Sequence, residues 1–185
     1  MLRELEEGMR PLRLLLVLLC ALAMMPGTEL HAETITGKVV GVADGDTLTL
    51  DSEGRRVVIR LSGIDAPERG HPDGQPFGRK SGDELRALAL HQVVTVETHK
   101  QDRYGREVGT VEVGGKDLGL EQVRSGMAWV FRRYLKELPQ TRRSAYLAAE
   151  DEARAHRRGL WATGEPLPPW EWRAQKTRRE QAARP

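Results

Sequence analysis

The sequence has only one cysteine, Cys20, and this residue lies in an apolar stretch near the N-terminus. A single thiol cannot form an internal disulfide, so the fold gains no covalent crosslink. Aromatic residues make up only 5% of the chain, and the formal net charge of +2 is small. A charge of this size does not oppose a polyanionic partner, but it does not indicate one either.

The sequence also lacks an apolar run long enough to cross a bilayer. The longest run, residues 14–25, has 12 residues, whereas a membrane-spanning helix needs about 20. Three arginines precede the run, Pro26 follows it, and Ala32 offers a small residue at a cleavage point. These features predict a signal peptide over residues 1–32, and hence an exported protein, periplasmic or extracellular, without a stable membrane anchor. Cys20 also allows a lipoprotein interpretation, which the bulky residue before it disfavours.

The remaining residues predict one folded domain followed by a short tail. Charged residues make up 30% of the chain, but the apolar residues recur periodically, which argues against disorder throughout. A chain of 185 residues suggests a single domain, which we place at residues 33–165 and expect to be monomeric. In the C-terminal segment, residues 166–185, the stretch 169–173 has the aromatic content to dock on the surface. Residues 175–185 are predicted to form a mobile polar tail.

Two acidic corners enclose a predicted β-hairpin. The first corner, Asp44-Gly45-Asp46, contains a glycine that permits a tight turn with a positive φ. Residues 47–50 and 57–61 then alternate between apolar and polar side chains, as half-buried strands do. In the second corner, residues 65–68, a proline ends the strand pairing because it has no N–H group to donate.

These corners contain residue types suited to a cation and to a phosphate. The carboxylates of Asp46 and Asp65 suit a divalent cation such as Ca²⁺, which takes only oxygen ligands. Arg60 offers a planar guanidinium matched to phosphate, and Glu68 is placed to act on a metal-bound water. Taken alone, either corner is better explained as part of a hairpin with solvated acidic turns.

The other strands and helices follow from the same periodicities. Alternating apolar residues predict strands, and apolar residues three and four positions apart predict helices. The basic and aromatic stretch at residues 128–134 fits the stacking of single-stranded bases, or burial of Trp129 and Phe131 in the core. The predicted strands are residues 34–42, 93–98 and 107–113, and the predicted helices are residues 77–90, 117–126 and 137–158.

Three motifs in order resemble the staphylococcal nuclease (thermonuclease) family. They are D-G-D-T at residues 44–47, R-L-S-G-I-D-A-P-E at 60–68 and D-R-Y-G-R at 102–106, and the resemblance extends over residues 34–161. It implies an α+β, mainly β fold, namely an OB-fold five-stranded β-barrel with three α-helices. It also implies Ca²⁺-dependent hydrolysis of phosphodiester bonds in DNA and RNA that leaves 3′-phosphate ends.

The resemblance gives catalytic and metal-binding roles to particular residues. Asp46 and Asp65 match the metal carboxylates of the family, and the backbone carbonyl of Ala66 matches a further ligand at a place often held by threonine. The phosphate-binding arginines of the family fall on Arg60 and Arg106. Its essential glutamate falls on Glu68, which either accepts a proton from the attacking water or orients that water.

The resemblance also identifies residues around the catalytic group. Asp44 is expected to fix the loop that holds the metal carboxylate after it, and Arg103 and Tyr104 are expected to contact substrate phosphate. Tyr134 matches one of two tyrosines that stack a base, whereas Arg132 stands where the other is expected and is a candidate for substrate binding. The expected partner is single-stranded or denatured DNA, or RNA.

The alternative is a non-catalytic OB-fold module that binds nucleic acid or protein. Family members of that kind have lost catalytic residues, whereas this sequence has all five that are expected, at positions 46, 60, 65, 68 and 106. Hydrolysis of denatured DNA in the presence of Ca²⁺ or of a chelator discriminates between the two hypotheses.

Overall fold

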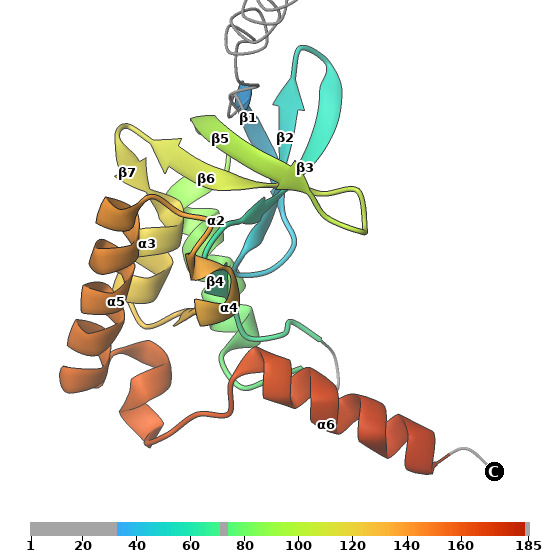
Figure 1. Ribbon diagram of the computed structural model, residues 1–185. Helices are drawn as coiled ribbons and strands as arrows, with labels where there is room; N and C mark the ends of the chain where they lie inside the picture. The colour runs from blue at the N-terminus through green and yellow to red at the C-terminus, as the bar shows by residue number, and fades with distance from the viewer. Residues whose placement is uncertain (1–32, 71–73, 184–185) are drawn as a thin grey trace, which may run out of the picture. The chain divides into compact units, whose positions relative to one another are not determined.

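The computed structural model describes residues 33–70 and 74–183 (Figure 1). The predicted signal peptide, residues 1–32, lies outside the described residues and stays a prediction. Within the described ranges, no helix has both the length and the apolar character needed to cross a membrane.

Five strands form a closed barrel of mixed direction, as predicted. Neighbouring strands pair in the order β3-β2-β1-β5-β6, and each of these pairs is antiparallel. A parallel pairing of β3 with β6 closes the barrel and sets Arg60 opposite Val108. The strands are β1 (Glu33–Val42), β2 (Thr47–Ser52), β3 (Arg55–Leu61), β5 (Val93–Gln101) and β6 (Glu107–Val113).

Three shorter strands extend this arrangement. β7 (Lys116–Asp117) pairs with the end of β6. β4 (Ile64–Asp65) forms a separate two-stranded sheet with β8 (Trp129–Val130), in which Asp65 lies opposite Trp129. This small sheet therefore fixes the second acidic corner against Trp129 and Val130.

The three predicted helices are present as α2 (Gly78–Ala89), α3 (Leu118–Arg124) and α5 (Gln140–Ala155). Helix α5 is shorter than the prediction of 137–158 and begins directly after Pro139, whose fixed φ suits a helix start. Helices α3 and α5 pack side by side (Figure 1). The described chain also has the short helix α4 (Arg132–Leu135), the 3₁₀ helix η1 (Gly159–Thr163) and the C-terminal helix α6 (Pro169–Ala182).

The main hydrophobic core lies between the barrel and these helices. Leu48, Leu50 and Ile59 on the barrel and Leu85 on α2 have no exposed surface, and burying each side chain of this size contributes roughly 1.5–3 kcal/mol. Tyr146 on α5 is also buried, and its hydroxyl donates a hydrogen bond to Asp117 at the start of α3 (2.8 Å). The core thus fixes the helices against the barrel without any covalent crosslink.

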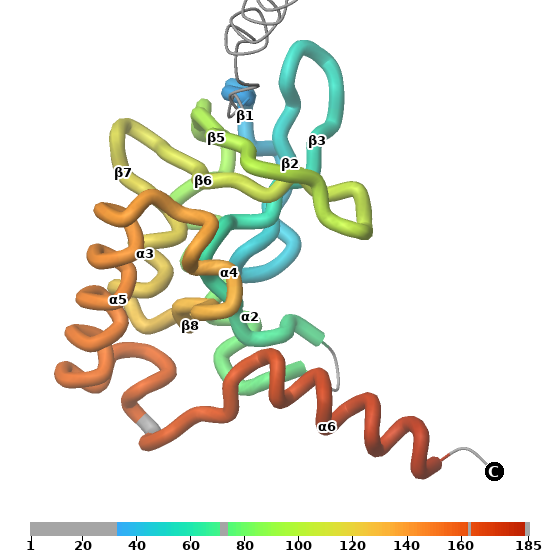
Figure 2. Tube along the Cα trace, viewed as in Figure 1, coloured from blue at the N-terminus to red at the C-terminus, as the bar shows by residue number. Residues whose placement is uncertain are grey.

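Helix α6 differs from the sequence-based prediction. The residues from 175 onward were predicted to be a mobile tail, but the structure continues a helix through them to Ala182, in red at the C-terminal end of Figure 2. Pro169 is the first helical residue and has a φ already suited to a helix, and good helix formers follow it.

The start of α6 docks on the domain, as the aromatic content of residues 169–173 had suggested. Trp170 stacks on Phe131, with ring centroids 5.3 Å apart and planes at 12°. Just before the helix, the backbone carbonyl of Leu167 accepts a hydrogen bond from Gln75 Nε2 (2.5 Å). These contacts join the start of α6 to Phe131, which follows β8, and to Gln75, which follows the second acidic corner.

Candidate active site

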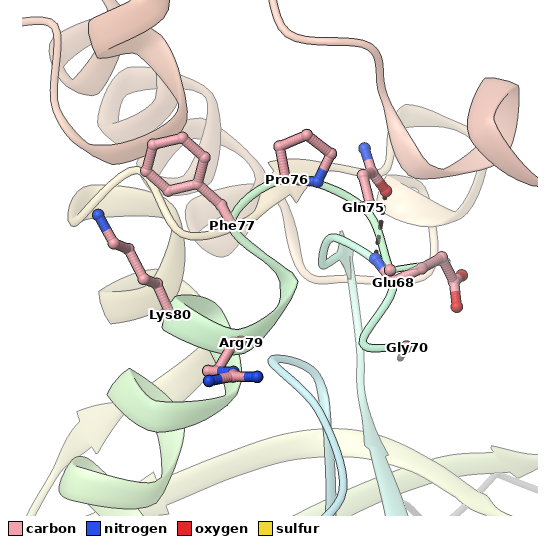
Figure 3. Close-up of a pocket in the computed structure, with 8 residues that line it drawn as sticks. Glu68, Gly70, Gln75, Pro76, Phe77, Arg79 and Lys80 are labelled. Carbon is pink, nitrogen blue, oxygen red and sulfur yellow. Dashed lines mark hydrogen bonds between the residues drawn. The ribbon is translucent and has the colours of Figure 1, made fainter. Parts of the chain in front are cut away.

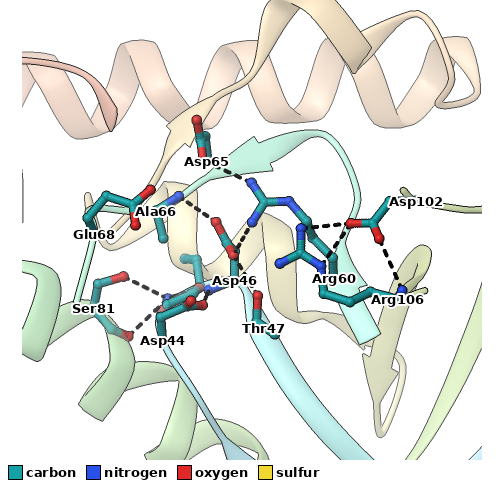
Figure 4. Close-up of polar contacts among 12 residues, drawn as sticks. Asp44, Asp46, Thr47, Arg60, Asp65, Ala66, Glu68, Ser81, Asp102 and Arg106 are labelled. Atoms are coloured by element: carbon teal, nitrogen blue, oxygen red, sulfur yellow. Dashed lines mark hydrogen bonds and ion pairs between the residues drawn. The ribbon is translucent and has the colours of Figure 1, made fainter. Parts of the chain in front are cut away.

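Two carboxylates and one guanidinium form the centre of the site. Arg60 Nη1 donates to Asp46 Oδ1 (2.5 Å), and Arg60 Nη2 donates to Asp65 Oδ1 (2.9 Å) (Figure 4). The antiparallel β2–β3 pairing places Arg60 opposite Thr47, next to the first acidic corner. Both carboxylates are almost fully buried. The structure therefore brings together three residues that the sequence had proposed for one site.

Hydrogen bonds fix the loop that carries Asp46. The backbone N–H of Asp46 donates to Asp44 Oδ1 (3.1 Å), so Asp44 lies where a residue that fixes this loop is expected. The backbone N–H of Ala66 donates to Asp46 Oδ2 (2.8 Å), and the hydroxyl of Thr47 donates to Asp46 Oδ1 (3.0 Å). Asp46 thus connects the two acidic corners directly.

Gly45 is needed for a reason other than the predicted one. Gly45 is not one of the described residues with a positive φ, so its backbone is not left-handed. A Cβ atom at this position would instead lie 1.7 Å from Ser81 Oγ and 2.8 Å from the Cβ of Ala66. The glycine therefore allows the backbone of the first corner to approach α2 and the second corner closely.

A buried glutamine that the sequence analysis missed also supports this loop. Gln122 Nε2 donates to the carbonyl oxygens of Gly45 (2.7 Å) and Ser81 (3.1 Å). Gln122 follows Leu118 by four positions, on the buried side of α3. A polar residue at a buried position of a predicted helix is the signal that could have identified it.

Burial and mutual repulsion perturb the acidic groups. Burial, together with the nearby carboxylate of Asp46, raises the pKa of Asp44 to about 7. Burial also raises the pKa of Asp65, even though guanidinium groups donate to it. Burial by itself would lower the pKa of Arg60, but the carboxylates of Asp46 and Asp65 outweigh it and raise that pKa. Burial thus outweighs the nearby guanidinium groups at Asp65, and a cation placed among these carboxyls would favour their charged forms.

The donor atoms suit a hard divalent cation such as Ca²⁺. The described residues contain no group of three or more histidine, cysteine, aspartate or glutamate side chains placed to hold a metal. Two buried carboxylates and the adjacent backbone carbonyl of Ala66 would supply the protein oxygens, and Ca²⁺ accepts backbone carbonyls and water as its other ligands. The residues present fit this ion, with two side-chain ligands and the remaining ligands from backbone and solvent.

Glu68 lies beside the two carboxylates and shares a partner with Asp65. Arg173 Nη1 donates to Glu68 Oε1 (2.5 Å), and Arg173 Nη2 donates to Asp65 Oδ2 (2.7 Å). Burial disfavours the charged guanidinium of Arg173, but its hydrogen bonds and attraction to Asp65 and Glu68 outweigh this and raise its pKa. Sequence reasoning missed Arg173, and the only signal was a basic residue directly after the aromatic residues at 170 and 172.

Arg106 is held by the tight turn that connects β5 to β6. Its backbone N–H donates to Asp102 Oδ1 (3.0 Å), and its Nε donates to Asp102 Oδ2 (2.8 Å). Slight burial opposes the charge of Asp102, but the hydrogen bonds from Arg106 lower the pKa of Asp102 below its usual range. In Figure 4, Arg60 lies between Arg106 on one side and Glu68 on the other. Both proposed catalytic arginines therefore reach the same cleft.

A cleft of about 790 Å³ is lined by Asp46, Arg60, Glu68 and Arg106, whereas Asp65 is buried behind it. Arg103 and Tyr104 lie at its rim, where Arg103 Nη2 donates to the hydroxyl of Tyr104 (2.7 Å) and Tyr104 is 68% exposed. The opposite part is aromatic and basic, with the predicted Tyr134. Phe131 and Arg133, from the basic and aromatic stretch indicated by the sequence, also line the cleft. Lys100, Trp170 and Arg173 line it as well and were not proposed for the site from the sequence.

The structure does not bring Arg132 into this cleft. Arg132 Nη2 donates instead to Oε2 of Glu150 on α5 (2.9 Å), and Glu150 is fully buried. The other carboxylate oxygen of Glu150 accepts the backbone N–H of Val130 (2.9 Å). The next residue, Arg133, lines the cleft. Successive residues of a helical turn point in different directions. The arginine that faces the cleft is therefore Arg133, one position after the residue expected from the sequence.

A smaller hollow of about 380 Å³ is lined by Glu68, Gln75 and Phe77, among others (Figure 3). Gln75 Oε1 accepts the backbone N–H of Glu68 there (3.2 Å), and Lys80 Nζ lies 5.1 Å from the centroid of the Phe77 ring. Gln75 also donates a hydrogen bond to the carbonyl of Leu167. It therefore connects the second acidic corner to the segment just before α6.

A closed five-stranded barrel has a cleft lined by Asp46, Arg60, Glu68 and Arg106, and the buried Asp65 contacts the same Arg60. This arrangement matches a phosphodiesterase of the staphylococcal nuclease type. A family model described as "Staphylococcal nuclease homologue" matches residues 58–163, and the chain belongs to this family. Membership of the family supports a nuclease function and a nucleic acid as substrate.

Individual proteins with similar sequences also have names that describe nucleases. A protein named "Uncharacterized endonuclease" from Escherichia coli is 40% identical over 145 residues, which are 77% of this chain and 87% of that protein. "Micrococcal nuclease" from Shigella flexneri is 37% identical over 146 residues, 74% of this chain and 79% of that protein. "Staphylococcal-like nuclease CAN1" from Arabidopsis thaliana is 39% identical over 118 residues, 64% of this chain and 33% of that protein.

Proposed function

We propose that this protein is a Ca²⁺-dependent nuclease that hydrolyses phosphodiester bonds of DNA and RNA and leaves 3′-phosphate ends. The observation that carries the proposal is the contact of Arg60 with both buried carboxylates in a cleft that Glu68 and Arg106 also line. We further propose that it acts as a monomer after export, in agreement with the signal peptide predicted from the sequence.

Each group has a distinct part in the proposed reaction. Asp46, Asp65 and the Ala66 carbonyl would hold Ca²⁺, which when bound neutralises phosphate charge and polarises a phosphoryl oxygen. Glu68, 39% exposed at the side chain, accepts a proton from the attacking water or orients it. Arg60 and Arg106 donate hydrogen bonds to phosphate oxygens, whose charge increases in the transition state.

The walls of the cleft favour a single strand with exposed bases. Tyr134 is partly exposed and has Lys100 Nζ 4.5 Å from its ring centroid, and the rim residues Arg103 and Tyr104 provide a second aromatic and basic pair. Aromatic faces stack on any base and nearby cations contact the backbone, so this combination holds single strands without sequence readout.

Hydrolysis of denatured DNA and of RNA, each with Ca²⁺ or with a chelator, tests the proposal. We expect cleavage only with Ca²⁺, and product ends that accept a further ligation only after phosphatase treatment. Asp46→Asn and Asp65→Asn should abolish cleavage, because each removes the charge of one ligand. Asp83→Asn, on the exposed side of α2, is the matched control and should be as active as wild type. Binding of single strands without cleavage would instead indicate a non-catalytic module.

A further inference from the structure

Every carboxylate oxygen proposed for metal binding already accepts a hydrogen bond. The two oxygens of Asp46 accept from Arg60, Thr47 and the Ala66 backbone. Asp65 Oδ1 accepts from Arg60, and Asp65 Oδ2 accepts from Arg173 Nη2 (2.7 Å). A cation that binds Asp65 must therefore displace a guanidinium or share an oxygen with one.

Of the two guanidiniums, Arg173 is the one that is able to leave. Arg60 lies on β3, a central strand of the closed barrel, and its side chain is only 20% exposed. The side chain of Arg173 is 43% exposed. Arg173 lies on the terminal helix α6, where Pro169 is the one buried residue among those described. Withdrawing Arg60 would remove a hydrogen-bond partner from both buried carboxylates, whereas withdrawing Arg173 requires only a new side-chain rotamer or the release of one peripheral helix.

We propose that Arg173 competes with a divalent cation for Asp65, so that α6 acts as a latch on the metal site. This inference rests on the proposed function, because it assumes that Asp65 is a metal ligand. A guanidinium and a divalent cation on the same carboxylate repel each other strongly at separations of a few ångströms. Binding of the cation and docking of Arg173 therefore oppose each other, and each weakens the other by the same factor.

The latch also controls Glu68. Arg173 Nη1 donates to Glu68 Oε1 (2.5 Å) and lies 3.3 Å from Asp65 Oδ1, so one guanidinium joins the metal ligand to the catalytic glutamate. When a cation displaces Arg173 from Asp65, the same movement frees the oxygen of Glu68 for water. The site therefore becomes competent only when the cation is present, and without the cation Glu68 is held in an ion pair.

The latch lies outside the part of the chain that the family model matches, because that match ends at residue 163 and α6 begins at Pro169. Trp170 on Phe131 and Leu167 on Gln75 hold the start of α6 close to the cleft. These contacts keep Arg173 near Asp65 at a high effective concentration. Arg173 is thus able to rebind whenever the cation dissociates.

Calorimetric titration of Ca²⁺ into the full mature chain, without nucleic acid, tests the latch. We expect Arg173→Ala and Arg173→Gln to bind Ca²⁺ roughly tenfold more tightly than wild type, a moderate effect because Arg173 is partly exposed and screened. Arg178→Ala is the matched control, because it removes the same charge from the exposed part of α6, and it should leave the affinity unchanged. Circular dichroism verifies that each variant is folded.

A second measurement follows Arg173 itself. In wild type, the guanidinium N–H signals of Arg173 in NMR spectra should be slowed in solvent exchange without Ca²⁺, because three hydrogen bonds hold them. Saturation with Ca²⁺ should return their exchange to the rate of Arg178. Slowed signals that persist in saturating Ca²⁺ would contradict displacement.

The outcomes separate the latch from the proposed function. Equal Ca²⁺ affinity in wild type and Arg173→Ala would overturn the latch, while loss of cleavage in Asp65→Asn would still support the nuclease. Weaker Ca²⁺ binding in Arg173→Ala would also overturn it and would make Arg173 a positioning residue for Asp65. Tighter binding in a chain that cleaves neither DNA nor RNA would support the latch and reject the nuclease.

Discussion

At the scale of single residues, Arg60 has two tasks that a lysine cannot combine. Its planar group contacts Asp46 and Asp65 through separate nitrogens, and in the proposed reaction it also faces the phosphate. An ammonium keeps the charge but has no fixed fork of donors. The shape of the side chain, in addition to its charge, therefore matters at this position.

Arg60→Lys should lower kcat by at least roughly 100-fold, the scale of losing one transition-state donor. KM should change little, because only interactions that are stronger in the transition state accelerate the step. Steady-state kinetics on denatured DNA measure both values. Arg55→Lys is the control, since it makes the same change at an exposed position of β3. A near-normal kcat in Arg60→Lys would refute the phosphate-binding role.

The sequence was enough to predict which residues meet at the centre of the site. It was not always enough to predict the physical reason why a residue is needed there. Asp46, Arg60 and Asp65 converge as the ordered motifs indicated. Gly45 was predicted at the right place for the wrong reason, because the constraint on it comes from Ser81 on another element. A contact between distant segments cannot be read from local turn chemistry.

At the scale of elements, the two neighbouring arginines of helix α4 have different surroundings. Arg132 turns toward the buried Glu150 of α5, whereas Arg133 lines the cleft. The basic and aromatic composition of residues 128–134 indicated the right segment. It did not fix the phase of the helix, which depends on how β8 and α4 pack against α5.

Arg133→Ala should weaken binding of single-stranded DNA and reduce the slope of log affinity against log salt by about 0.7, as for one lost phosphate contact. Arg132→Ala should leave this slope unchanged. It should instead lower the free energy of unfolding by about 1–3 kcal/mol, because it removes a partner from a buried carboxylate. Fluorescence titrations at several salt concentrations and urea denaturation measure the two effects. A changed slope in Arg132→Ala would return that residue to the interface.

The strands and the larger helices were predictable, whereas α6 was not. Periodic burial on one side gives strands and amphipathic helices a signal in the sequence, as in β5 and α2. Helix α6 has almost no buried side, since Pro169 is its one buried residue among those described. Its position depends on a few contacts, Trp170 on Phe131 and Arg173 on two carboxylates, which leave no periodic pattern.

At the scale of the whole molecule, we expect the core to form without a metal. The buried side chains of the barrel and of α2, α3 and α5 form a continuous apolar cluster that includes neither Asp46 nor Asp65. A cation that binds the folded state alone should stabilise that state by mass action, and its removal should leave the fold intact.

Calcium at one hundred times its dissociation constant should therefore add about 2.7 kcal/mol to the free energy of unfolding. For a domain of this size, that gain raises Tm by roughly 5–15 °C. Differential scanning calorimetry with Ca²⁺ and with chelator measures the shift, and far-UV circular dichroism at room temperature should be the same in both. Asp65→Asn should lose most of the shift. Unfolding on chelation would contradict a metal-independent core.

The parallel pairing of β3 with β6 has a consequence for how activity is acquired. It joins segments that are far apart in the chain, at Ile59–Leu61 and Glu107–Gly109, and such non-local pairs form slowly because a long loop must be closed first. The same pairing brings Arg60 and Arg106 to one cleft. With the roles proposed for Arg60 and Arg106, a ribosome-bound fragment that has not yet reached β6 contains both acidic corners but not the assembled pair of arginines, and we expect it to be inactive toward the nucleic acids around it while it is being made.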